Sequence, residues 1–287
     1  MSDSLAPDYE VVIEPSRATL QIDWRELWEY RDLLMLLVQR DFNARYKQTL
    51  LGPLWFIAQP VLTTIVFAIF FGRIAGIPTD GVPAPLFYMC GLLGWNYFAQ
   101  NITTAGSTFV NNQALFTKVW FPRLIMPAAA VASNMIAVAL QFGAFLGFFA
   151  WFAWVRQEPG AAQLTWRALL VPLPLLHLAA LSLGISLWMA ASTAKYRDLI
   201  HLNQFVVQLW MFATPVIYPL SKVPPHWAWL VWLNPVSVPV EAVRVCLLNR
   251  GTVDPLALGI SLAMTAVLLF TGIIVFQRSA RSAVDTI

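Results

Sequence analysis

Seven long stretches of the chain contain no charged residue. They cover residues 48–72, 81–117, 124–155, 168–194, 199–221, 223–240 and 255–277. A helix that crosses a bilayer needs about 20 mostly apolar residues. Six of the stretches contain such a run, at about 54–72, 85–105, 125–154, 169–192, 199–217 and 256–276. The pattern therefore predicts an all-α integral membrane protein with six transmembrane helices.

The seventh stretch, 223–240, does not fit a regular membrane helix because prolines interrupt it. It also contains three tryptophans, a residue type that gathers near lipid head groups. We therefore expect short re-entrant or interfacial helices before the last span. The prolines are Pro224, Pro225, Pro235 and Pro239, and the tryptophans are Trp227, Trp229 and Trp232.

The region before the first span divides into two parts. Residues 1–22 are polar and acidic, and we expect a flexible tail. Asp23 and Glu26 form a capping-box pattern, which predicts a helix from Trp24 to about residue 50, ended by Gly52-Pro53. Its apolar and charged positions alternate with helical spacing, so residues 23–52 are expected to lie as an amphipathic helix in the membrane interface. The transmembrane domain then covers residues 53–287.

Charged pairs with a spacing of four residues occur twice in the predicted interfacial helix. Arg25 can pair with Glu29, and Asp41 can pair with Arg45, because residues four apart share one helical face.

The low charge content excludes a soluble enzyme. Only 11% of the 287 residues are charged, against about 25% in ordinary soluble domains. The net charge is +3, and the basic residues are scattered, whereas a nucleic-acid-binding face requires them to cluster. An even number of spans places both termini on one side. Nine basic residues flank the spans on that side and six on the other, which favours cytoplasmic termini.

Several kinds of chemistry are missing from the sequence. It has no GxxxxGK[ST] phosphate-binding loop, no HExxH motif and no GxSxG motif. The predicted spans contain no carboxylate to hold a coupling ion. We therefore expect no cofactor or metal in this chain, and energy for any transport to come from another subunit. His177 lies in the fourth span, either as a functional group or as a neutral histidine bonded to a neighbouring helix.

The loop 106–124, between the second and third spans, contains a short amphipathic pattern. Asn112 can cap a helix over Gln113–Phe121, and Pro122 ends it. Such a helix either docks into a partner protein or lies among lipid head groups. The residues proposed for partner contact are Leu115, Phe116, Lys118, Val119, Trp120 and Arg123.

Aromatic residues are numerous, with 13 Trp, 7 Tyr and 19 Phe. Aromatic rings can stack on the C–H faces of sugars, although most of these residues are expected to pack in the core or against lipid. Those that adjoin breakers or polar groups within spans are candidates for a polysaccharide channel. They are Trp55, Phe56, Trp95, Tyr97, Phe98, Trp210 and Phe212.

Four segments in order resemble the ABC-2-type polysaccharide exporter permeases. The first and most specific is the run from Arg40 to Trp55, RDFNARYKQTLLGPLW. The others are Phe121-Pro122-Arg123, Tyr196-Arg197-Asp198, and Asn234-Pro235 followed by Glu241 and Arg244. The resemblance covers nearly the whole chain from about residue 24.

This resemblance implies a homodimer in the bacterial inner membrane, bound to two cytoplasmic ABC ATPases that carry the ATP and Mg. Its expected cargo is a lipid-linked polysaccharide such as O antigen, capsule or teichoic acid. By this resemblance, the helix before the first span is a gate helix at the membrane interface. Residues 113–122 form the coupling helix that docks on the ATPase, and the pieces at 218–240 are re-entrant helices that narrow the outer exit. We add Arg40 and Arg45 to the expected ATPase contact. Two alternatives remain: an ABC-2 exporter of a drug or lipid, and a membrane enzyme that acts on lipid-linked sugars.

Overall fold

The computed structural model describes residues 24–46, 52–112, 115–116, 121–156 and 164–285. Every regular element within these ranges is a helix, which confirms the all-α prediction. Six helical segments correspond to the predicted spans. They are α3 (Trp55–Phe67) with its π-helical extension η2 (Ala68–Ile74), α4 (Ala84–Ala105), α7 (Ile125–Ala150) with η3 (Trp151–Arg156), α8 (Pro172–Lys195) preceded by η4 (Trp166–Leu170), α9 (Leu199–Ala213) and α12 (Pro255–Asp285). Each lies within or around one of the six predicted ranges.

Four of these helical segments are long and apolar enough to cross a membrane. They are Trp55–Ile74, Ile125–Val155, Trp166–Lys195 and Pro255–Ala280. The α4 helix has sufficient length, but Asn96, Gln100 and Asn101 make it more polar. The α9 helix is apolar but has only 15 residues, since it ends ahead of Pro215, which has no amide donor to continue it. The protein is therefore a multi-pass membrane protein with four candidate spans by length and composition.

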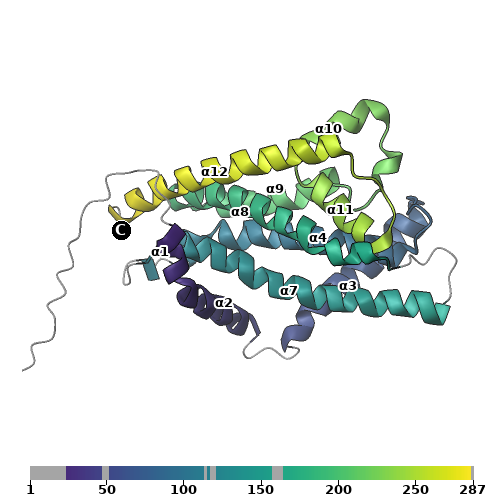
Figure 1. Ribbon diagram of the computed structural model, residues 1–287, viewed down its shortest axis with the longest axis horizontal. Coiled ribbons are helices and arrows are strands. Elements are labelled where there is room, and N and C mark those ends of the chain that lie inside the picture. Colours follow the sequence, from purple (N-terminus) through teal and green to yellow (C-terminus); the bar gives the residue numbers. More distant parts are fainter. Residues whose placement is uncertain (1–23, 47–51, 113–114, 117–120, 157–163, 286–287) are drawn as a thin grey trace, which may run out of the picture.

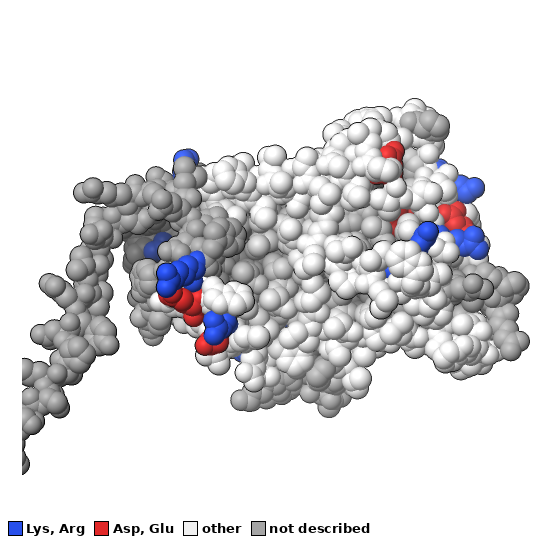
Figure 2. Space-filling model, viewed as in Figure 1, with Lys and Arg blue, Asp and Glu red and all other residues white. Residues whose placement is uncertain are grey.

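Charged side chains lie mainly at the two ends of the molecule. On the face shown in Figure 2, Lys, Arg, Asp and Glu gather near both ends, with an uncharged surface between them. One end holds α1 (Trp24–Glu29) and the C-terminus, and the other holds α10 (Ala228–Leu233) (Figure 1). An uncharged belt between charged ends is the surface expected of a protein that lies across a bilayer.

The N-terminal helix is broken at Tyr30 rather than continuous. It forms α1 and α2 (Arg31–Tyr46). The Arg25 Nε and Glu29 Oε1 atoms lie 3.4 Å apart, as the spacing predicted. The predicted pairing of Asp41 with Arg45 is wrong, because Asp41 accepts hydrogen bonds from its neighbour Arg40.

One face of α2 packs on the beginning of α7. Leu37 of α2 is buried in a small apolar cluster with Phe121 and Ile125, and Leu33 and Leu34 pack around it. On the opposite face, Met35 and Leu36 are exposed. The helix therefore has an inward anchor and an apolar outer surface that suits a membrane interface.

The core surrounds α4. This helix packs against α3, α7, α8 and α11 (Ser237–Leu248), and 15 of its 22 residues are buried. The α8 and α12 helices form a second close contact, at Gly184 and Gly272. Small residues allow membrane helices to approach closely, because no side chain separates the two backbones.

The connection between α9 and α12 consists of short pieces. They are η5 (Leu220–Lys222), η6 (Pro225–Trp227), α10 and α11. This agrees with the interruption that the prolines predicted.

Candidate functional site

A cavity of about 450 Å³ lies between α3, α4 and α7, beside the last turn of α2. Its walls combine amide and hydroxyl side chains with aromatic rings, and Arg45 is the charged residue among them. The lining residues are Arg45, Trp55, Phe56, Gln59, Pro60, Thr63, Asn96, Tyr97, Ala99, Gln100, Thr103, Asn134, Ala137, Val138 and Gln141.

Helical spacing places the polar side chains on this wall. Gln59 and Thr63 are four residues apart on α3, and Asn96, Gln100 and Thr103 follow at intervals of four and three on α4. Residues at these intervals share one face of a helix. Amides and hydroxyls both donate and accept hydrogen bonds without charge. The cavity can therefore bind a neutral, hydroxyl-rich molecule.

A chain of hydrogen bonds beside the cavity joins the four helices α2, α7, α4 and α8. Arg45 Nη1 donates to Asn134 Oδ1 of α7 at 2.8 Å, and Asn134 Nδ2 donates to Asn101 Oδ1 of α4 at 2.8 Å. Asn134 Nδ2 also lies 3.0 Å from Thr104 Oγ1, and Asn101 Nδ2 donates to Ser182 Oγ of α8 at 2.9 Å. The end of α2 is thereby held to the core.

This network was not among the features predicted from the sequence. Asn101 and Asn134 are almost fully buried, at 0% and 1% exposed. The available signal was an amide side chain inside a predicted span, because such a group must find a partner away from water. The identity of that partner depends on how the helices pack, which the spacing along one helix does not determine.

The seven predicted channel aromatics separate into two groups. Trp55, Phe56 and Tyr97 line the cavity. The other four lie elsewhere: Trp95 and Phe98 are buried in the core, Trp210 contacts Phe98 edge-on, and Phe212 is exposed on α9. The structure thus brings three of the seven to one wall.

Asn234 fixes the position of Trp210 and the end of α9. Trp210 Nε1 donates to Asn234 Oδ1 at 3.0 Å. Asn234 Nδ2 donates to the Ala213 carbonyl at 3.1 Å and to Thr214 Oγ1 at 3.0 Å. These bonds satisfy a carbonyl that the end of the helix leaves without an intrahelical partner.

The neighbouring Arg244 is also structural. It is 1% exposed, and its Nη1 donates to Glu241 Oε2 at 2.5 Å. Its Nη2 donates to the Pro215 carbonyl at 2.6 Å, and its guanidinium lies 4.1 Å from the centre of the Phe87 ring. Arg244 thus connects α11 to the break after α9 and to α4.

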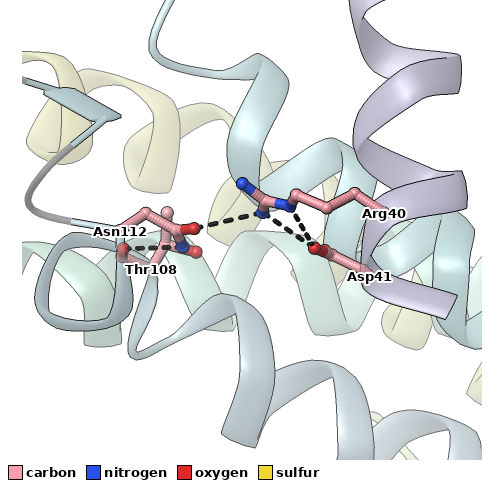
Figure 3. Close-up of polar contacts among 4 residues, drawn as sticks. All are labelled: Arg40, Asp41, Thr108 and Asn112. Atoms are coloured by element: carbon pink, nitrogen blue, oxygen red, sulfur yellow. Dashed lines mark hydrogen bonds and ion pairs between the residues drawn. The ribbon is translucent and has the colours of Figure 1, made fainter. Parts of the chain in front are cut away.

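The proposed coupling loop begins beside α2. Arg40 Nη2 donates to Asn112 Oδ1 at 3.2 Å and to Asp41 Oδ1 at 2.7 Å, and Asn112 Nδ2 donates to the Thr108 carbonyl (Figure 3). Thr108 opens the short helix α5 (Thr108–Asn111). The side chain of Arg40 therefore joins α2 to the residue that precedes the loop.

The partner-contact residues are only partly described. Leu115 and Phe116 are half-buried beside the α2–α7 cluster, and Phe116 stacks on Phe121 with ring centres 5.6 Å apart. Arg123 is half-buried, and Arg45 turns toward the cavity. The predicted contacts at Lys118, Val119 and Trp120 lie outside the described residues.

His177 and the two cysteines take structural positions. His177 Nε2 lies 3.0 Å from Thr265 Oγ1 and 3.2 Å from Ser261 Oγ, both on α12, so it bonds to a neighbouring helix. Cys90 and Cys246 are both free.

The chain is similar to known membrane transport proteins. The model of the ABC-2 type transporter family matches residues 32–248. The chain is 30% identical over 267 residues to the O-antigen export system permease protein RfbA of Myxococcus xanthus, covering 92% of this chain and 98% of that protein. It is 25% identical to the protein of the same name from Klebsiella pneumoniae, covering 85% of this chain and 87% of that protein. It is 22% identical to the polysialic acid transport protein KpsM of Escherichia coli, covering 84% of this chain and 91% of that protein.

Proposed function

The chain belongs to the ABC-2 type transporter family, and from this premise we propose that it is the permease subunit of an ATP-driven exporter of a lipid-linked polysaccharide. O antigen or a similar surface polymer is the cargo. The similar proteins named for O-antigen export and polysialic acid transport support this substrate class.

The cavity between α3, α4 and α7 is the observation that carries the proposal. Its polar walls are made of neutral amides and hydroxyls together with the charged Arg45, and Trp55, Phe56 and Tyr97 lie beside them. Sugars present hydroxyls to amides and C–H faces to aromatic rings, so both kinds of wall match a carbohydrate. An apolar drug or lipid would leave the buried Gln141 Oε1 atom, which has no hydrogen-bond partner among the described residues, still unpaired, and this is costly in a membrane. The wall therefore favours a polysaccharide over the drug or lipid alternative.

The subunit arrangement follows from the same proposal. Two copies of the chain, each with six spans and cytoplasmic termini in the bacterial inner membrane, assemble with two ABC ATPases. The ATPases bind ATP and Mg, because this chain has no GxxxxGK[ST] loop. The spans contain no carboxylate for an ion-driven mechanism.

The loop 113–122 is proposed to dock on the ATPase. The Arg40–Asn112 hydrogen bond and the stacking of Phe116 on Phe121 support a mechanical connection from this loop to α2. Movement of the docked loop would then reach the helix that borders the cavity.

Reconstitution tests the function directly. The chain is placed in proteoliposomes with and without its ATPase, and both ATP hydrolysis and transfer of lipid-linked polysaccharide are measured. We expect neither activity from the chain alone, and ATP-dependent transfer from the complex. Specific ATP turnover by the chain alone, or a complex that hydrolyses ATP without moving polysaccharide, would reject the proposal.

A further inference from the structure

A second hollow lies on two of the three helices that form the polar cavity. It is an apolar groove of about 490 Å³ between α3 and α7, lined by Ile57, Ala144, Gly147, Phe148 and Trp151. No charged residue contributes to it. A hydrocarbon chain can occupy such a surface without leaving a polar group unpaired.

The groove and the cavity adjoin one another along both helices. On α3, Phe56 lines the cavity and the next residue, Ile57, lines the groove. On α7, Gln141 lines the cavity and Ala144 lines the groove, three residues further on the same face. The α7 helix begins beside α2 and runs toward the opposite end of the molecule (Figure 1). Along α7 the cavity residues therefore lie nearer the α2 end than the groove residues do, whereas on α3 Ile57 lies between the cavity residues Phe56 and Gln59.

Gln141 provides an independent indication of a ligand. The residue is 9% exposed, and its Oε1 atom is buried with no hydrogen-bond partner among the described residues. A buried amide oxygen without a partner is costly. A bound molecule that donates a hydroxyl group would supply the missing hydrogen bond.

Arg45 indicates the charge of the ligand. The hydrogen bond found for it among the described residues goes to the neutral Asn134, so no carboxylate balances its charge there. A cation among the otherwise uncharged residues that line the cavity favours an anionic group, such as a phosphate, on the molecule that enters.

We propose that the α3–α7 face binds one lipid-linked saccharide in two parts, with its polar head in the cavity and its hydrocarbon chain in the groove. This inference rests on the proposed function and adds the place where a single subunit holds its substrate. The order along α7 suits a lipid of the leaflet on the α2 side, because there the cavity for the head lies nearer α2 than the groove for the chain.

Glycine substitution can fill the groove without disturbing the fold. A Cβ atom added at Gly147 would meet nothing within 4 Å, and the same holds for Gly259 on α12. Gly147→Leu therefore blocks the groove, and Gly259→Leu is a matched control on another exposed helix face. For the cavity, Gln141→Leu removes the unpaired amide, and Gln208→Leu changes an exposed glutamine of α9 that lies outside the cavity.

The test measures binding by the intact permease–ATPase complex in nanodiscs. The probe is a fluorescent oligosaccharide linked by diphosphate to a polyprenyl chain, and phosphatidylglycerol in excess is the competitor. We expect Gly147→Leu and Gln141→Leu each to weaken binding about tenfold or more, and both controls to bind as the parent chain does. Gln141→Leu should not lower the melting temperature, because it removes an unpaired buried polar group.

The possible outcomes test the two-part binding site and the proposed function independently. Parent-like binding by either Gly147→Leu or Gln141→Leu overturns the two-part site, as does displacement of the probe by phosphatidylglycerol. In those cases, ATP-dependent export by the parent complex would leave the proposed function intact. Failure of the parent complex to export would reject the function, and the binding pattern of the variants would still decide the site.

Discussion

The α3 and α4 helices are consecutive along the chain and contact each other, yet they are packed in opposite ways. Of the 22 residues of α4, 15 are buried, whereas α3 buries only Pro60 and Thr64 among its 13 residues. The α4 helix has neighbours on most sides, while Leu62, Ile65 and Val66 of α3 are exposed. A helix with so little cover must be surrounded by lipid, by another subunit or by cargo.

This difference separates residues that maintain the fold from residues that are free to act on a substrate. Buried amides on the core side of α4 have partners, as Asn101 does with Ser182 and Asn134. On the α3–α7 side, the Oε1 atom of Gln141 has none among the described residues. The two faces of the same helix bundle should therefore respond differently to substitution.

Loss of the Arg244 side chain should have the largest effect. Arg244→Met leaves Glu241 as a buried, uncompensated charge and leaves the Pro215 carbonyl without its donor. Breaking a buried ion pair by removing one partner costs about 3–5 kcal/mol. We expect loss of folded protein or a greatly lowered melting temperature in detergent. The double variant Glu241→Leu with Arg244→Met should recover part of the loss, and equal stability of the single variant and the parent would contradict this role.

Alanine substitution of Trp95 on α4 and of Trp55 on α3 compares the two helices at side chains of the same type. Trp95 is 4% exposed in the core around α4, so Trp95→Ala should destabilise the protein by about 3–5 kcal/mol. Trp55 is 46% exposed and lines the cavity, so Trp55→Ala should leave the melting temperature nearly unchanged and lower export. Thermal unfolding and export assays on both variants measure the contrast. Reversed results would place Trp95 on the transport path and Trp55 in the core.

The contact between α8 and α12 should tolerate no added atom at Gly184. A Cβ there would lie 2.7 Å from the backbone nitrogen of Leu269, which is too close for two packed helices. Gly184→Ala should therefore cost about 1–3 kcal/mol through overpacking. Gly259→Ala on the outer surface of α12 provides the control and should leave thermal stability unchanged. Equal stability of the two variants would show that this contact is looser than the structure indicates.

The smallest effect on stability is expected at Arg40. Its bonds to Asp41 and Asn112 lie at an exposed position, where such pairs contribute about 0–1 kcal/mol. Arg40→Ala should nevertheless reduce export per ATP hydrolysed, because it disconnects α2 from the proposed coupling loop. Simultaneous measurement of ATP turnover and export tests this. An unchanged ratio would exclude Arg40 from the connection.

Sequence patterns predicted the helices better than their contacts. Charge-free runs located α3, α4, α7, α8, α9 and α12, four of which are candidate spans with their extensions, because charged groups are excluded from the membrane interior whatever the tertiary packing. The spacing of Trp95 and Phe98 showed that they share a helix face, but not that α9 would cover it with Trp210. Likewise, the spacing of Asp41 and Arg45 allowed a pair that did not form, because Asn134 of α7 lies within reach of Arg45. The residue spacing within one helix does not predict which side chains of other helices will contact it.

The most direct test of the account is export after the cavity is filled. Thr63→Trp places a large side chain in the cavity wall, and Leu62→Trp places the same side chain at the next position, which is exposed and outside the cavity. Both variants are assembled with the ATPase in proteoliposomes, and ATP-dependent transfer of lipid-linked polysaccharide is measured. We expect Thr63→Trp to abolish transfer while the ATPase still co-purifies with the permease, and we expect Leu62→Trp to export as the parent does. Equal export by the two variants would contradict the claim that the cavity between α3, α4 and α7 carries the cargo.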